Sequence, residues 1–124
     1  MIVLDSSGWI EFFADGPFAE QYAEQLKHPQ HVLTPTVALY EVYKWIKRER
    51  SEEQALIAVA AMQKTRVVPL SDDIALAAAD ISLAERLAMA DSIMLATART
   101  HHAELLTGDS DFAGMDGVTV FAKT

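Results

Sequence analysis

Residues 2–13 read IVLDSSGWIEFF, in which a short apolar run leads into a helix through an acidic residue. The apolar run at residues 2–4 is typical of a strand buried on both faces of a parallel sheet. The apolar side chains of residues 9–13 predict a helix, with Ser6 and Ser7 as its predicted caps. Asp is itself a common helix cap, but the two serines make that role unnecessary for Asp5. We therefore expect the Asp5 carboxylate to project from the edge of the sheet.

Further apolar runs alternate with helical patterns along the rest of the chain. Strands are predicted at residues 31–34, 66–70, 104–107 and 118–121. Helices are predicted at residues 18–27 and 90–101, and others begin near residues 36, 51 and 71. Alternating strands and helices favour crossover connections and a mainly parallel sheet. We therefore predict an α/β fold, a single α/β/α sandwich domain over residues 1–124, with about five short strands and helices on both faces.

The composition is that of one globular domain. The chain has 124 residues, 51% of them apolar, and 18 acidic against 10 basic side chains give a net charge of −8. It contains no cysteine, which excludes zinc–thiolate sites, thiol nucleophiles and disulfide scaffolds. The opening residues carry no basic segment, and no apolar run is long enough to span a bilayer. We therefore expect no signal peptide, no membrane anchor and a cytoplasmic location.

Acidic residues follow two of the predicted strands. Asp5 follows the first strand, and Asp109 and Asp111 follow the fourth. In open parallel sheets, ligands bind at the carboxyl ends of the strands, so these acids are expected near a site. Glu41 and Asp91 lie among apolar residues on predicted helices. Taken alone, Glu41 is better explained as a solvated residue, and Asp91 as either a helix-start acid or an inward-facing ligand.

Taken together, these acids form a pattern that single residues do not. Clustered carboxylates repel one another and raise one another's pKa unless a cation neutralises them. Oxygen ligands without Cys or His select Mg²⁺ or Mn²⁺ rather than zinc. Such an ion binds phosphate oxygens and activates a water molecule for attack on phosphorus. The residues therefore predict hydrolysis of a phosphodiester, with Mg²⁺ as the cofactor and Mn²⁺ as the alternative.

Three motifs together resemble those of PIN-domain proteins, and in particular the VapC ribonuclease toxins of bacterial toxin–antitoxin pairs. The motifs are IVLDSSGWIEFF near the start, MADSIMLATA at residues 89–98 and LLTGDSDF at residues 105–112. They occur in the order found in that family, and the resemblance covers essentially the whole chain. Each motif alone would be only suggestive, whereas the three together are specific.

The resemblance implies which residues act in the site. The catalytic and metal-binding acids of the family correspond to Asp5, Glu41, Asp91 and Asp109. The Thr-x-Asp pattern of the family matches Thr107-Gly108-Asp109, and Ser6 and Thr107 correspond to supporting hydroxyls. The last motif offers a second acid, Asp111, as a candidate for the fourth position.

The resemblance also implies an activity and partners. These are a Mg²⁺- or Mn²⁺-dependent endoribonuclease acting on RNA of the tRNA or rRNA class, a homodimer, and a VapB-type antitoxin that neutralises the toxin. The implied fold has a parallel sheet with its first strand in the centre. Four carboxylates suit either one metal ion or two.

A basic segment lies directly downstream of Glu41. It comprises Lys44, Lys47, Arg48 and Arg50. One interpretation is a solvated helix face, and the other is a contact with the RNA backbone. The short distance in sequence from Glu41 favours the RNA contact.

The first two predicted helices carry many aromatic side chains for a thin layer over a small sheet. They include Trp9, Phe12, Phe13, Phe18 and Tyr22. We expect part of this apolar surface to be exposed and covered by the tail of the antitoxin. An Arg or Lys of that tail would then pair with the acids in place of the metal.

A receiver-like phosphoacceptor domain on a flavodoxin-type fold is the alternative from another functional class. It would need a second acid beside Asp5 and a phosphorylatable Asp at the end of the third strand. The chain instead has two serines after Asp5, and Pro69-Leu70-Ser71 at the end of the predicted third strand. The sequence therefore favours the nuclease.

Overall fold

The computed structural model describes residues 1–121, which form alternating strands and helices in the predicted order. The strands are β1 (Ile2–Leu4), β2 (Val32–Pro35), β3 (Arg66–Val68), β4 (Glu104–Thr107) and β5 (Val118–Val120). The α-helices are α1 (Ser6–Phe13), α2 (Ala19–Leu26), α3 (Thr36–Glu49), α4 (Glu52–Met62), α5 (Asp72–Glu85) and α6 (Met89–Thr100). Two short 3₁₀ helices, η1 (Pro29–His31) and η2 (Ser110–Phe112), complete the described part.

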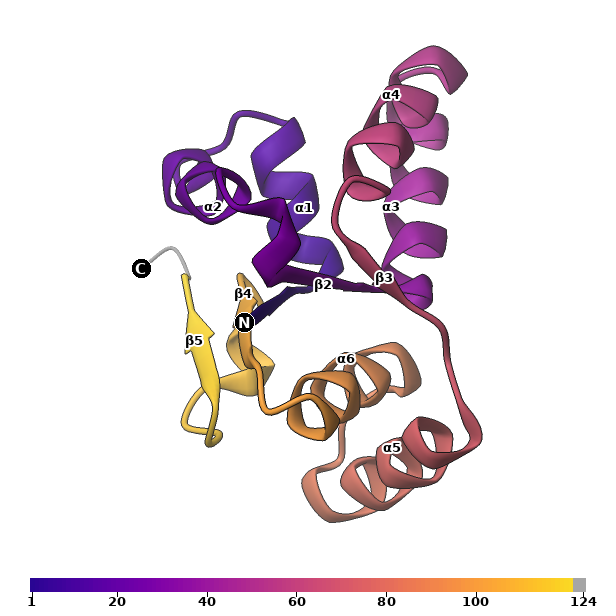
Figure 1. Ribbon diagram of the computed structural model, residues 1–124, viewed down its shortest axis with the longest axis vertical. Helices are drawn as coiled ribbons and strands as arrows, with labels where there is room; N and C mark the ends of the chain where they lie inside the picture. Colours follow the sequence, from indigo (N-terminus) through magenta and orange to yellow (C-terminus); the bar gives the residue numbers. More distant parts are fainter. Residues whose placement is uncertain (122–124) are drawn as a thin grey trace.

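The five strands form one parallel sheet in the order β3-β2-β1-β4-β5. The prediction of a parallel sheet with the first strand central is confirmed. Val3 pairs with Leu33 of β2 on one side and with Leu105 of β4 on the other, and all three side chains are fully buried. The chain builds the sheet outward from β1 to β3, then crosses back to place β4 on the other side of β1 (Figure 1). A topological switch point therefore lies between β1 and β4.

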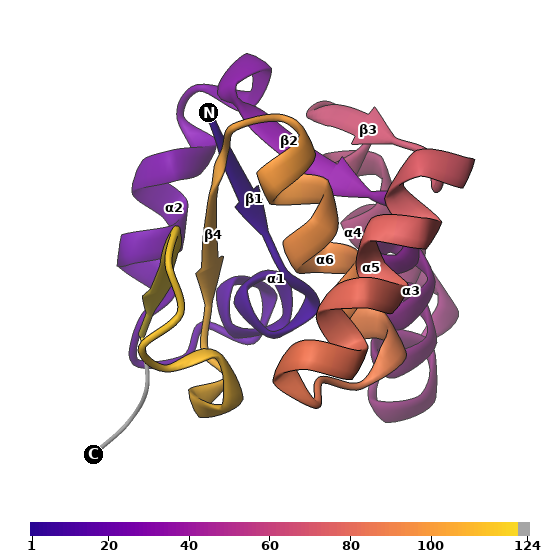
Figure 2. The same ribbon diagram turned by 90° about the horizontal axis from the view of Figure 1, so that it is seen from below.

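Helices cover both faces of the sheet, as predicted for an α/β/α sandwich. Helices α1 to α4 lie on one face, and α5 and α6 lie on the other (Figure 1). Helix α6 lies directly against the sheet, with α5 outside it (Figure 2). This position explains why residues 92–98 of α6 are buried without a break. The acid at position 91 immediately precedes this buried run.

The start of α1 differs from the sequence-based prediction. Asp5 is the N-cap of this helix, and its carboxylate accepts a hydrogen bond of 3.1 Å from the Gly8 amide. Ser6 and Ser7 lie inside the helix, so their prediction as caps was wrong. Gly8 is required here for a steric reason, because a Cβ at this position would lie 2.7 Å from Cε1 of the buried Tyr22 ring.

The aromatic side chains of the first two helices are more buried than predicted. Trp9 and Tyr22 are fully enclosed, and Phe12, Phe13 and Phe18 are half-buried against the core. The prediction that part of this aromatic surface is exposed therefore holds only for Phe12, Phe13 and Phe18, which are partly exposed. The large apolar side chains that are exposed lie elsewhere, mostly on α3, α4, α5 and the start of α6. Among residues 1–121, no helix is both long and apolar enough to cross a membrane.

Candidate active site

The candidate site lies at the carboxyl edge of the sheet, at the switch point between β1 and β4. In Figure 2 both strands run downward, and α1 begins where β1 ends. Asp5 follows β1 directly, and Asp109 follows β4 after Thr107 and Gly108. Ligands of open parallel sheets bind where neighbouring connections leave in opposite directions, which is the case here.

Hydrogen bonds hold the Asp5 carboxylate in one orientation. Its Oδ1 accepts from the Ser7 hydroxyl at 2.6 Å and from the Gly8 amide at 3.1 Å. Its Oδ2 accepts from the Thr107 hydroxyl at 2.6 Å. The residue is only 4% exposed. The Asp5 side chain therefore both caps α1 and lies at the carboxyl edge of the sheet.

Ser7 and Thr107 tie the ends of β1 and β4 together. The Ser7 hydroxyl donates to Asp5 and accepts from the Gly108 amide at 2.9 Å. The Thr107 hydroxyl donates to Asp5 and accepts from the Asp109 amide at 3.0 Å. The supporting position of Thr107 matches the sequence-based expectation, whereas that of Ser7 was missed. The sequence could have indicated this role, because Ser7 lies two residues after Asp5 at the end of a predicted strand.

Glu41 and Asp91 approach the same region from two helices. The Ser6 hydroxyl donates to Oε1 of Glu41 at 2.6 Å, so α1 orients a side chain of α3. Asp91 lies in the first turn of α6 and is half-buried. Its carboxylate lies within the field of Asp109, Asp5 and Glu41. The structure thus places the other three predicted acids within electrostatic range of Asp91. We call the four residues the acidic cluster: Asp5, Glu41, Asp91 and Asp109.

Burial and mutual repulsion weaken the ionised form of two members of the acidic cluster. Burial raises the pKa of Asp5, with a smaller contribution from the charge of Asp109, although three hydrogen bonds oppose the shift. Burial, followed by the charges of Asp109, Asp5 and Glu41, raises the pKa of Asp91 to about 6. Perturbed carboxylates gathered in one place are typical of functional sites.

Asp109 and Asp111 differ in their surroundings. Asp109 is half-buried, and its Oδ1 accepts from the Asp111 amide at 2.9 Å, which caps η2. Asp111 is exposed, and its charge makes the smallest contribution to the raised pKa of Asp91. The charge of Asp109 makes the largest contribution after burial. This geometry favours Asp109 as the fourth acid.

Known proteins share both the sequence pattern and the fold. The model of the PIN domain matches residues 2–118. The chain belongs to the PIN domain family. No curated protein matches it at a significant level.

Several solved PIN-domain structures of toxin–antitoxin systems resemble this one. A toxin–antitoxin complex from Klebsiella pneumoniae is 27% identical, covers 97% of both chains and gives a TM-score of 0.82. VapC20 of Mycobacterium tuberculosis, a Sarcin–Ricin loop cleaving toxin, is 19% identical over 97% of this chain and 98% of that chain, with a TM-score of 0.80. VapBC2 from Rickettsia felis, bound to a promoter DNA fragment, is 13% identical over 98% of both chains, with a TM-score of 0.78.

The donor set of this PIN domain fits a hard divalent cation. No ion pair found between residues 1–121 involves a member of the acidic cluster. Within the same residues, no three acidic or histidine side chains are close enough to form a preassembled metal site. Carboxylates that repel one another stay apart, and a cation would allow them to approach. Oxygen ligands of this kind suit Mg²⁺ or Mn²⁺.

The basic segment of the PIN domain divides over two surfaces. A groove of about 250 Å³ beside the acidic cluster is lined by Ser6 and Glu41 together with Lys44 and Arg48. Lys47 is not part of this groove, because it lies over the Tyr43 ring and pairs with Glu52 at 3.4 Å. Lys44 and Arg48, which are four residues apart on α3, therefore share a groove with Glu41. The rest of the basic segment does not line this groove.

Proposed function

We propose that this PIN domain is a metal-dependent endoribonuclease that acts as the toxin of a VapBC-type toxin–antitoxin pair. The observation that carries the proposal is the acidic cluster, in which four carboxylates from separate parts of the chain lie within electrostatic range of Asp91 near the switch point of the sheet. The resemblance to VapC20, a toxin that cleaves RNA of the Sarcin–Ricin loop, supports the same activity here. RNA of the tRNA or rRNA class is the proposed substrate.

The residues of the chain have separate parts in this activity. A divalent ion bound by the acidic cluster would supply charge neutralisation and an activated water for attack on phosphorus. Ser7 and Thr107 hold the Asp5 carboxylate through hydrogen bonds of 2.6 Å, which keeps it ready to bind the ion without reorganisation. Ser6 orients Glu41 in the same way from the other side of the helix start.

The direct test is cleavage of structured RNA by the purified protein with Mg²⁺ or Mn²⁺, compared with the same reaction in EDTA. Metal-dependent cleavage at internal bonds is the expected result. Intact RNA under all metal conditions would contradict the proposal. The family match gives no support to the receiver-like alternative.

We expect the groove along α3 to contribute to RNA binding. Replacing Lys44 and Arg48 together by Gln removes both cations that line the groove with Glu41. We expect RNA binding to weaken and the slope of log Kd against log salt to fall by about one to two, because fewer counterions are released. Binding is measured by fluorescence anisotropy over a range of salt concentrations, with metal affinity as a separate readout that should change little.

The matched control replaces Lys47 and Lys27 by Gln, which removes the same charge from outside the groove. Both side chains are exposed and paired with neighbouring acids, Lys47 with Glu52 and Lys27 with Glu24. Equal losses of affinity and slope in the two double variants would show that net charge matters and that the groove does not guide the RNA.

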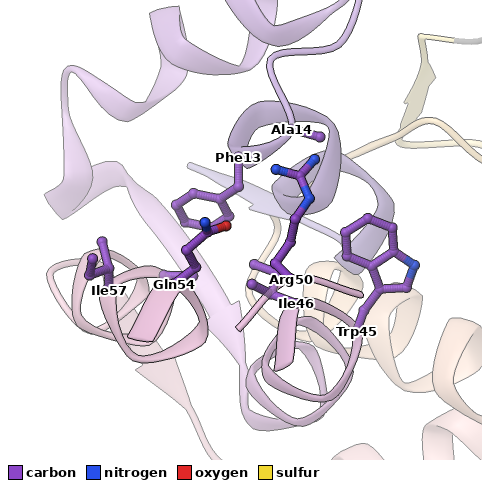
Figure 3. Close-up of a pocket in the computed structure, with 8 residues that line it drawn as sticks. Phe13, Ala14, Trp45, Ile46, Arg50, Gln54 and Ile57 are labelled. Atoms are coloured by element: carbon purple, nitrogen blue, oxygen red, sulfur yellow. The ribbon is translucent and has the colours of Figure 1, made fainter. Parts of the chain in front are cut away.

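An antitoxin of the VapB type and a second copy of the chain are the proposed protein partners. Solved structures of similar chains include toxin–antitoxin complexes, which supports an antitoxin. A cavity of about 160 Å³ lies between α1, α3 and α4. Figure 3 shows Phe13, Trp45 and Ile57 among the side chains that line it. Apolar side chains of an antitoxin tail fit such a cavity. The exposed Leu76 and Leu83 of α5 are apolar surface that a homodimer would cover, and a cytoplasmic location completes the proposal.

Inhibition by the antitoxin is expected to involve the acidic cluster itself. An Arg or Lys of the tail would pair with carboxylates that otherwise repel, and so displace the metal. Titrating the candidate antitoxin into the toxin should abolish RNA cleavage and weaken Mn²⁺ binding by about tenfold or more. If the inhibited complex binds Mn²⁺ as tightly as the free toxin, inhibition is steric and the displacement idea is wrong.

A further inference from the structure

A second cavity borders the acidic cluster and plays no part in the activity described so far. It has a volume of about 330 Å³ and is lined from α1 by Ser7 and Glu11, from the α2 region by Phe18 and Tyr22, and from the chain after β4 by Gly108. Ser110 and Phe121 complete the lining. Because Ser7 also holds Asp5, the cavity opens directly beside the proposed catalytic carboxylates. Its size falls within the range of small-molecule binding sites.

The Tyr22 hydroxyl has no hydrogen-bond partner among residues 1–121. The side chain is fully buried, and no atom of residues 1–121 forms a hydrogen bond with its oxygen. Nearly all buried hydroxyls in folded proteins are paired, so an unpaired one at a cavity wall is suited to a polar atom of a ligand. Burial and the negative charges of Asp5 and Glu11 raise the pKa of Tyr22 above its usual range, so the hydroxyl keeps its proton and is able to donate.

Aromatic rings form another part of the lining. The Phe18 and Phe121 rings are stacked with centroids 6.0 Å apart, and the Tyr22 ring meets Phe121 edge-on at 5.4 Å. Phe18 and Phe121 remain partly exposed, so a flat ligand is able to pack against the open part of this aromatic surface. Proteins that read single-stranded RNA stack unpaired bases on rings of this kind.

The charge of the cavity argues for a base rather than a phosphate. None of the lining side chains within residues 1–121 is basic, and Glu11 adds a carboxylate. Oε2 of Glu11 accepts from the Phe18 amide at 3.1 Å, which leaves acceptor positions on the carboxylate for further donors. A carboxylate and a donating hydroxyl together match guanine, which presents N1–H and N2–H₂ donors beside the O6 acceptor.

We propose that this cavity, which we call the Tyr22 cavity, binds the guanine base of a nucleotide next to the scissile phosphate and so sets the sequence preference of cleavage. The proposal rests on the proposed ribonuclease function, whose site it extends. The base would pack against the open part of the Phe18 and Phe121 rings, donate to Glu11 and accept from the Tyr22 hydroxyl. The sugar–phosphate chain would then continue across the acidic cluster toward the groove of Lys44 and Arg48.

The test uses guanosine as the probe, because a nucleoside without phosphate isolates base binding from metal and backbone contacts. Guanosine, adenosine, cytidine and uridine are titrated into the metal-free protein and followed by two-dimensional NMR. Guanosine should shift the amide signals of Ser7, Gly108 and Phe121 the most. Absence of these shifts would overturn the proposal, whether or not the protein cleaves RNA.

Two variants and one control sharpen the test. Tyr22→Phe removes only the unpaired hydroxyl, so the fold should be kept, and the Kd for guanosine should rise about threefold to tenfold. Gly108→Ala adds a methyl group 3.5 Å from the Ser7 hydroxyl and 3.8 Å from that of Tyr22, and should exclude the base without steric clash. Tyr43→Phe loses a hydroxyl on α3 outside the cavity and should bind guanosine as the wild type does. Unchanged binding in both cavity variants would overturn the assignment.

A peptide side chain is the competing occupant, since a guanidinium also suits a carboxylate and aromatic rings. Acetylarginine amide is therefore titrated in parallel, and tighter binding of this probe than of guanosine at the same residues would show a peptide site instead. The nucleoside readout is separate from cleavage. If guanosine binds through Tyr22 but no RNA is cut under any metal condition, the ribonuclease function fails and the base site remains.

Discussion

Asp5→Asn is expected to abolish metal-dependent RNA cleavage while the protein stays folded. The substitution removes one ligand charge and keeps the shape of the side chain. The amide oxygen is able to keep the bond from the Gly8 amide, and the amide nitrogen is able to donate to the Thr107 hydroxyl, which now rotates to accept. Changing groups that merely support a metal ligand costs about tenfold to a hundredfold, so loss of a ligand should cost more than about a hundredfold. Cleavage of structured RNA with Mn²⁺ is the measurement.

The same variant should unfold less readily than the wild type when no metal is bound. Burial raises the pKa of Asp5, which means that its ionised form is unfavourable in the folded protein at neutral pH. Urea unfolding in EDTA at pH 7 should therefore give a higher midpoint for Asp5→Asn. Asp80→Asn is the matched control, because this acid is exposed on α5 and should alter neither cleavage nor stability. Full activity in Asp5→Asn would remove Asp5 from the site.

The order of elements followed from local patterns, because each strand is a short apolar run between predicted helices. The central position of the first strand was implied only by the resemblance to the PIN-domain family. The residues that cap α1 could not be predicted in the same way. Asp5, Ser6 and Ser7 are all good caps, and the choice depends on Thr107, which is about a hundred residues away and donates to Asp5. The burial of Tyr22 likewise depends on its close approach to Gly8, and the spacing of apolar residues in the sequence does not predict that contact.

The position of the acids near one edge of the sheet was predictable, whereas their hydrogen-bonded support was not. Each acid stands out against an apolar stretch of sequence, and the topology brings strand ends and helix starts to one edge. The support from Ser7 requires the approach of Gly108 across the switch point, and that contact exists only in the folded chain. The division of the basic segment also needed the structure, because the spacing alone does not show that Lys44 and Arg48 share a groove with Glu41 while Lys47 does not.

Acidification is expected to weaken metal binding steeply at a pH where most carboxylates are still ionised. The pKa of Asp91 is raised to about 6, and that of Asp5 is raised by burial. A protonated carboxyl is a poor metal ligand, so Mn²⁺ affinity and cleavage should be constant at high pH and fall below pH 6. Each group that must lose its proton lowers the affinity by about tenfold for every pH unit below its pKa. A Mn²⁺ titration between pH 5 and 8 measures this dependence.

The stability of the metal-free protein should change with pH in the opposite direction. An acid whose pKa is higher in the folded state binds more protons there than in the unfolded chain, so its contribution to the free energy of unfolding rises as the pH falls from about 7 through 6. Asp91→Asn should therefore stabilise the metal-free protein at pH 7 and have little effect near pH 4. Asp80→Asn should show no such difference at either pH. A parallel fall of metal affinity and of the stability of the metal-free protein below pH 6 would contradict the raised pKa of Asp91. Protonation of Asp91 should weaken metal binding, but it should also stabilise the metal-free fold because it removes repulsion within the acidic cluster.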